Sequence, residues 1–256
     1  MSKLILEYLT ITDRDIPVIT CYPEGGRNLP LVLINHGTTG SAEGMLWFET
    51  RLANEGFFCV NIDALWHGSR SDGKLFERLE PAVYKKNYLD MLLSMAKDMS
   101  AIIDFYEGND LVNTQKVGMT GISQGGYVAF MTMTKDSRIT AAAPMIGSPD
   151  LEDKYGNSPE WDELSDDVKA YVLEHSPLRN FEKMFPTALL VQASTEDTVV
   201  PIGGIRRLHE KLEPLYEACP EQYKFIEYPD IGHDCTREMQ DEAVLWLSQK
   251  LKQETR

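Results

Sequence analysis

Basic side chains are scarce in this sequence. Its 25 lysines and arginines are outnumbered by 40 aspartates and glutamates, which leaves a formal net charge of −15 at pH 7. A surface of this charge repels the phosphate backbone of a nucleic acid, so we expect no nucleic-acid partner. The acidic residues are spread along the chain without long runs, which is typical of a solvated protein surface.

Cysteine and long apolar runs are also scarce. Cys21, Cys59, Cys219 and Cys235 form no C-x-x-C pair, which argues against a disulfide framework and favours a reducing compartment. The opening MSKLILEYLTI lacks a basic segment followed by a long apolar stretch, so it does not resemble a signal peptide. No apolar run approaches the roughly 20 residues of a transmembrane helix. We therefore expect a cytoplasmic protein with no membrane partner.

Motifs that would hold a cofactor are missing as well. The sequence contains neither a Walker phosphate loop nor a G-x-G-x-x-G dinucleotide motif. The triplet HDC at residues 233–235 has no further ligands at the spacing that a zinc site needs. We expect neither a cofactor nor a metal ion.

What the sequence does contain is a regular alternation of apolar strands and amphipathic helices. An antiparallel hairpin at a sheet edge is expected first, over residues 3–11 and 16–22. Further strands are expected over residues 29–36, 57–64, 116–122, 139–147, 187–193 and 223–229, and helices over residues 41–56, 87–107, 124–134, 203–218 and 241–253. Strands that alternate with helices indicate a mostly parallel sheet covered on both faces. The sequence predicts one α/β domain spanning residues 1–256, with a sheet of about eight strands.

Residues 148–185 interrupt this alternation. The segment is polar, acidic and punctuated by prolines, and a connection of this length in a compact domain is usually functional. We interpret it as a small cap or lid, with a decorative helical insertion as the alternative. Residues 161–175 have helical spacing. The side chains expected on one helical face are Trp161, Leu164, Val168 and either Tyr171 or Val172.

The stretch TGISQGG, residues 120–126, places a serine where an apolar strand meets an apolar helix. Ser123 has a glycine two residues away on each side, at Gly121 and Gly125. A sharp strand-to-helix turn brings the two flanking backbones together, so larger side chains would clash there. Such a turn presents the serine outward, in front of the free N–H groups at the start of the helix. The pattern predicts that Ser123 is a nucleophile.

A serine nucleophile needs a histidine to accept its proton. In this kind of turn the chain order is serine, acid, histidine, and only His175, His209 and His233 follow Ser123. His175 lies in the insertion and His209 in a predicted helix. His233 alone lies in a loop after a predicted strand, so we predict that it is the base.

The histidine in turn needs an acid that fixes its tautomer. Asp197 lies in the loop after the strand at 187–193 and is ranked first. Asp150, which follows the preceding strand, is ranked second, and Glu196 third.

An oxyanion also needs two N–H donors. One is expected from Gln124, the residue after the nucleophile. The other is expected from the glycine-rich loop HGTTGS, from Thr38 or, as the near alternative, Thr39.

With these residues assembled, the chain resembles the α/β-hydrolases, and within them small bacterial esterases of the dienelactone-hydrolase-like and prolyl-oligopeptidase-like groups. The resemblance is carried by NHGTTGS, DALWHGSR, GISQGG, STEDTVVP and IGHD, in that order along nearly the whole chain. Two features depart from the family. Dienelactone hydrolases carry a cysteine nucleophile where this chain has Ser123, and Ala193 and Ser194 stand where the family often has His-Gly.

The resemblance implies a serine hydrolase that cleaves carboxylic esters of small molecules, with short acyl chains as the expected substrates. The alternatives within the class are a peptidase or amidase and a thioesterase acting on small substrates. From another class, the alternative is a binding protein that has kept the fold without its catalysis.

Overall fold

The computed structural model describes residues 3–11, 14–78, 81–152, 162 and 165–252. Its centre is one sheet in the order β1-β2-β4-β3-β5-β6-β7-β8. The eight strands are β1 (Leu4–Ile11), β2 (Ile16–Pro23), β3 (Leu29–Asn35), β4 (Phe58–Ile62), β5 (Val112–Ile122), β6 (Ile139–Met145), β7 (Ala188–Ser194) and β8 (Tyr223–Tyr228). The pairs β1/β2 and β2/β4 are antiparallel and all other pairs are parallel. The expected α/β sheet and its edge hairpin are confirmed.

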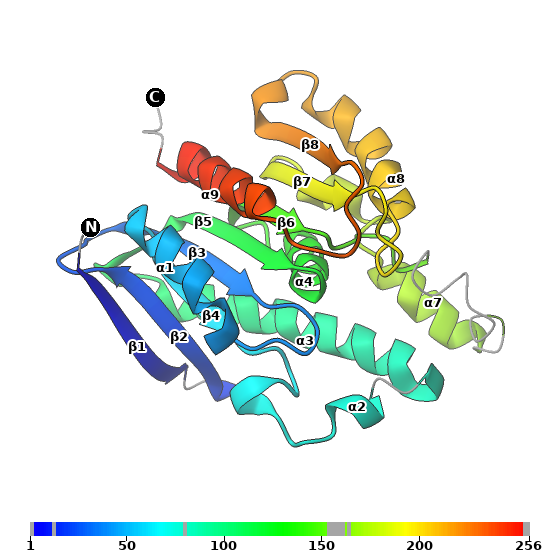
Figure 1. The fold of residues 1–256 in the computed structure, drawn as a ribbon, viewed down its shortest axis with the longest axis horizontal. Coiled ribbons are helices and arrows are strands. Elements are labelled where there is room, and N and C mark those ends of the chain that lie inside the picture. Colours follow the sequence, from blue (N-terminus) through cyan, green and yellow to red (C-terminus); the bar gives the residue numbers. More distant parts are fainter. Residues whose placement is uncertain (1–2, 12–13, 79–80, 153–161, 163–164, 253–256) are drawn as a thin grey trace.

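Helices cover both faces of the sheet, as Figure 1 shows. Among the described residues, the helices are α1 (Leu46–Asn54), α2 (Leu75–Arg78), α3 (Pro81–Tyr106), α4 (Gln124–Met133), α7 (Asp166–His175), α8 (Gly203–Leu212) and α9 (Arg237–Leu251). Successive side chains of a strand point to opposite faces, so each strand serves two apolar cores. Leu31 and Leu33 of β3 belong to the core that also includes side chains of α3, α4 and α8, whereas Val32 and Ile34 belong to the core that includes side chains of α1 and α9.

Some helices do not begin at the residues that the sequence pattern predicted. The segment expected to be helical from residue 41 starts with a 3₁₀ turn (Glu43–Met45) and becomes α1 only at Leu46. Helix α9 starts at Arg237, four residues earlier than expected, because the Thr236 side chain accepts the Met239 N–H and caps the first turn.

The insertion contributes α7 and a 3₁₀ turn (Phe181–Met184). Of the predicted helical face, Trp161 and Leu164 lie outside the described residues, Val172 is buried, and Tyr171 is 38% exposed. Tyr171 and His175 line a surface groove together with residues of α3. That residues 1–256 form a single domain, and that residues 148–185 act as its cap or lid, stays a prediction.

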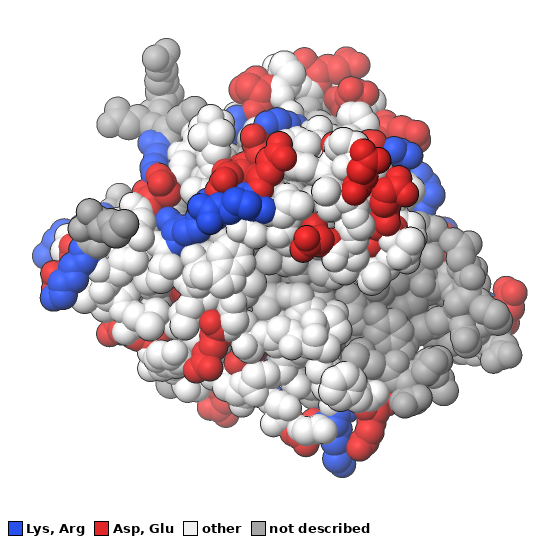
Figure 2. All heavy atoms as spheres, viewed as in Figure 1, with Lys and Arg blue, Asp and Glu red and all other residues white. Residues whose placement is uncertain are grey.

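The surface carries both signs of charge. On the face shown in Figure 2, acidic side chains are spread between basic ones, as expected from the scattered charges of the sequence. Among the described residues, no helix combines the length and the apolar character that crossing a membrane requires.

Candidate active site

Ser123 occupies a strained turn between β5 and α4. Its backbone has φ +54° and ψ −109°, in a region that residues with a side chain rarely adopt. A Cβ atom on Gly121 would lie 2.6 Å from the backbone of Gly125, and one on Gly125 would overlap the carbonyl oxygen of Asn35. The two glycines therefore let β5, α4 and the end of β3 approach closely enough to fix the serine.

His233 lies in the loop after β8 and reaches the serine. Its Nε2 is 2.8 Å from Ser123 Oγ, and its Nδ1 is 2.7 Å from Asp197 Oδ2. A carboxylate oxygen accepts hydrogen bonds, so the ring proton belongs on Nδ1 and leaves Nε2 free to accept from the serine hydroxyl. The structure thus brings together the three residues that the sequence ranked first for nucleophile, base and acid.

Asp197 is itself held by the backbone. Its Oδ1 accepts the N–H of Val199 at 2.9 Å and that of Val200 at 2.7 Å, and its side chain is 1% exposed. The other two candidate acids are engaged elsewhere. Asp150 pairs with Arg207 of α8 at 2.7 Å, and the exposed Glu196 lies in contact with the Thr195 hydroxyl. The geometry therefore favours Asp197 as the partner of His233.

The remaining histidines after Ser123 lie apart from it. The Nδ1 of His175 is 3.1 Å from the Tyr171 carbonyl on α7. The ring of His209 stacks on Tyr223, with its Nε2 3.9 Å from a carboxylate oxygen of Glu213.

The loop after β3, residues 36–41 and here called the β3 loop, lies against the serine turn. A Cβ atom on Gly37 would be 3.7 Å from Ser123 Cβ. Thr38 Oγ1 donates to Gln124 Oε1 at 3.2 Å, so the two predicted N–H donors come from residues in contact. Within the part of the chain that the structure describes, neither backbone N–H makes a hydrogen bond to another residue. Thr39, the alternative donor, has a left-handed φ of +65°.

A cleft of about 620 Å³ opens over Ser123 and His233. Its walls include Thr38 from the β3 loop, Tyr88 from α3 and the exposed Val199. Cys235 also lines it, and burial raises the pKa of this thiol to about 11, so it stays protonated at neutral pH. The described residues contain no group of three or more His, Cys, Asp or Glu side chains that could hold a metal ion.

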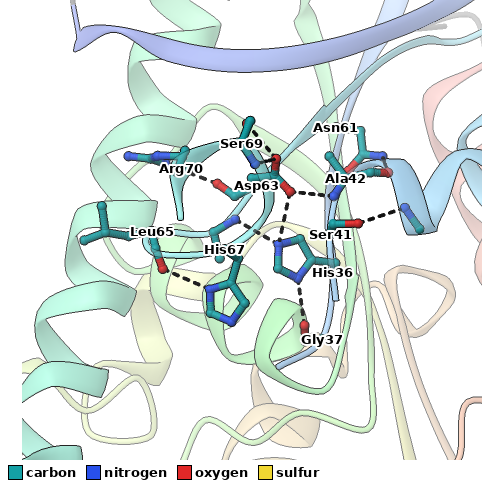
Figure 3. Close-up of polar contacts among 12 residues, drawn as sticks. His36, Gly37, Ser41, Ala42, Asn61, Asp63, Leu65, His67, Ser69 and Arg70 are labelled. Atoms are coloured by element: carbon teal, nitrogen blue, oxygen red, sulfur yellow. Dashed lines mark hydrogen bonds and ion pairs between the residues drawn. The ribbon is translucent and has the colours of Figure 1, made fainter. Parts of the chain in front are cut away.

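Sequence reasoning missed a second group of polar residues, at the start of the β3 loop and the end of β4 (Figure 3). His36 and Asp63, from the ends of the adjacent strands β3 and β4, are both nearly buried. Asp63 begins the motif DALWHGSR, which carried part of the family resemblance but received no role. Two ionisable residues at neighbouring strand ends were the signal that could have drawn attention to them.

Known proteins match this fold and these motifs. Residues 47–253 match the model of the prolyl oligopeptidase family. The chain is 25% identical over 250 residues to "Putative esterase YitV" of Bacillus subtilis (strain 168), covering 92% of this chain and 96% of that protein. It is 24% identical over 255 residues to esterase YjfP of Escherichia coli (strain K12), covering 93% and 96%.

A solved structure agrees in fold. TT1662 from Thermus thermophilus superimposes with a TM-score of 0.80 at 21% identity, covering 98% of this chain and all of that chain. The resemblance predicted from the five motifs is confirmed. The family match spans well over half of the sequence, so this chain belongs to the prolyl oligopeptidase family and is a carboxylesterase-type hydrolase with the α/β-hydrolase fold.

Proposed function

We propose that this protein hydrolyses carboxylic esters of small molecules with short acyl chains, through Ser123, His233 and Asp197. The observation that carries the proposal is the continuous contact from Asp197 Oδ2 to His233 Nδ1 at 2.7 Å and from His233 Nε2 to Ser123 Oγ at 2.8 Å. The relatives named as esterases support the ester as the substrate class.

The reaction proceeds in two halves. Ser123 Oγ attacks the acyl carbon while its proton moves to His233 Nε2, and the imidazolium then gives this proton to the leaving alcohol. A water molecule next attacks the acyl-enzyme, with His233 accepting its proton and returning it to Ser123 Oγ. Asp197 holds the Nδ1–H and stabilises the imidazolium that forms in each half.

The negative charge on the substrate oxygen is held by the N–H groups of Thr38 and Gln124. Two features support this assignment: both amides lack a partner among the described residues, and Gln124 is the first residue of α4, where the helix dipole favours negative charge. Loss of one such donor typically costs about 3 kcal/mol of transition-state stabilisation.

The test is hydrolysis of p-nitrophenyl esters from acetate to octanoate by the purified protein and by Ser123→Ala. We expect the highest kcat/KM with the shortest chains, and a loss on the order of 10⁴-fold or more in kcat for the variant. Ser137→Ala, in the exposed turn after α4, is the matched control and should keep wild-type activity. Near-wild-type hydrolysis by Ser123→Ala would show that another residue carries the reaction.

A peptidase or amidase is the second candidate, because the matching family model is that of prolyl oligopeptidases. Hydrolysis of an amide requires protonation of a poorer leaving group by the same histidine. Comparing kcat/KM on an ester and an anilide with the same acyl group separates the two activities. An anilide rate that equals the ester rate would favour the peptidase.

A further inference from the structure

His36 is a buried residue that neither half of the reaction uses. It stands at the end of β3 and is 2% exposed. Its Nε2 accepts the backbone N–H of Ala64 at 2.9 Å. A backbone amide can only donate, so Nε2 carries a lone pair, and the ring proton lies on Nδ1. Burial lowers the pKa of His36, which keeps the ring neutral.

This tautomer turns the Nδ1–H toward the β3 loop. Nδ1 lies 2.7 Å from the carbonyl oxygen of Gly37, which therefore accepts its proton (Figure 3). The same carbonyl accepts the N–H of Gly40 at 2.9 Å. A Cβ atom at position 40 would press on both partners, at 3.0 Å from the Gly37 oxygen and 3.2 Å from His36 Nδ1. The Gly37 carbonyl is thus fixed on the side of the loop that faces His36.

The direction of this carbonyl determines the direction of the next N–H. In a planar trans peptide the C=O of Gly37 and the N–H of Thr38 point in opposite directions. The carbonyl points to His36, so the Thr38 N–H points away from it, on a loop that also lines the cleft with Ser123. We propose that His36 is a positioning residue that orients the Gly37–Thr38 peptide and thereby aims the Thr38 N–H at the substrate oxygen. This inference rests on the proposed esterase reaction.

Asp63, which directly follows β4, also holds the β3 loop in place. Its Oδ1 accepts the Ala42 N–H at 2.7 Å, just past the β3 loop. Its Oδ2 accepts from the Ser69 N–H at 2.8 Å and from the Ser69 hydroxyl at 2.7 Å, in the loop after β4. Its distance to His36 Nε2 is 3.8 Å, too long for a hydrogen bond, so Ala64 and not the carboxylate fixes the tautomer. One carboxylate therefore holds the two loops together around the His36 ring.

The test compares two amide replacements of His36. An asparagine amide reaches the place of Nδ1 and can still donate to Gly37, whereas a glutamine amide reaches the place of Nε2 and cannot. We expect His36→Asn to retain most of the wild-type kcat. We expect His36→Gln to lower kcat on the order of 10²-fold, the effect of losing one oxyanion donor, with KM nearly unchanged. The affinity for a trifluoromethyl ketone, which mimics the tetrahedral intermediate, should fall in parallel with kcat.

Other outcomes overturn the proposal. Equal losses of kcat in His36→Asn and His36→Gln would do so. A higher KM at unchanged kcat would also do so, as would a loss of kcat that matches the loss of folded protein measured by circular dichroism. Wild-type protein with ¹⁵N-labelled histidine supplies a measurement that needs no variant. His36 should show the Nδ1–H tautomer between pH 7 and 9, and an Nε2–H signal in this range would refute the assignment. If Ser123→Ala retains hydrolysis, the proposed function fails. If Ser123 is required and His36→Gln keeps full kcat, only the positioning role fails.

Discussion

Glu49 is a carboxyl group inside an apolar core, and its position should make the protein less stable as the pH rises. It lies on α1 with 0% exposure. Its Oε2 accepts from Asn61 Nδ2 at 3.2 Å, while Oε1 has no hydrogen-bond partner among the described residues. Burial is the main cause that raises the pKa of Glu49 to about 8, and the Asn61 hydrogen bond opposes it only in part.

Proton linkage gives the direction and the size of this change in stability. In the unfolded chain the group titrates near 4.5, so between pH 4.5 and 8 the folded state holds a proton that the unfolded state has lost. The free energy of unfolding therefore falls with rising pH, by about 1.4 kcal/mol for each pH unit in this window. The contribution is complete below pH 4.5 and is lost above pH 8, a total of roughly 5 kcal/mol.

Glu49→Gln isolates this contribution, because glutamine has the shape of the protonated acid and does not ionise. Urea unfolding of both proteins at pH 5, 6, 7 and 8 should show the stability of the wild type falling relative to the variant by about 1.4 kcal/mol per pH unit. Taking the difference cancels the other titrating groups. Glu43→Gln is the matched control, because Glu43 is exposed and its carboxyl stays in water on folding. A difference that is flat from pH 5 to 8 would refute the reasoning.

Four further substitutions test the candidate site. Asp197→Asn should lower kcat on the order of 10⁴-fold in ester hydrolysis, because the amide cannot hold the His233 tautomer. Asp150→Asn, in contrast, should leave the kcat of the folded enzyme near wild type. Gln124→Met should also keep kcat near wild type, since the proposed reaction uses only the backbone N–H of this residue, and a fall as large as that of Asp197→Asn would contradict this. Gly125→Ala should lower the free energy of unfolding by about 1–3 kcal/mol in urea, because its Cβ would overlap a β3 carbonyl.

The sheet could be predicted because its strands are short apolar runs that end at glycine, proline or a polar residue. The helix starts were harder to place, since they depend on single side chains. Thr236 caps α9 by accepting the N–H of Met239, and this hydrogen bond fixes a start that apolar spacing alone placed at residue 241. The 3₁₀ turn before α1 is also local, with Ser41 Oγ accepting the Gly44 N–H at 3.1 Å.

The candidate site could be predicted in part for a similar reason. Ser123 and His233 are marked by chain order and by their places after strands. The choice between Asp197 and Asp150 needed the folded chain, because the partner of Asp150 is Arg207, 57 residues further on. The role of His36 could not be assigned from the sequence. A histidine at the end of a strand gives the same sequence pattern whether its ring contacts solvent or accepts a backbone N–H.

Ser123, His233 and the Thr38 N–H of the candidate site are each held by different interactions. These interactions determine how each part should respond to substitution. Ser123 is fixed by backbone packing at Gly121 and Gly125, where no side chain can be added without overlap or close contact. His233 depends on Asp197, whose second oxygen is held by two backbone N–H groups. The Thr38 N–H depends on the tautomer of one neutral histidine. Substitutions at the glycines should therefore act first on stability, whereas substitutions at Asp197 or His36 should act on kcat in a protein that still folds.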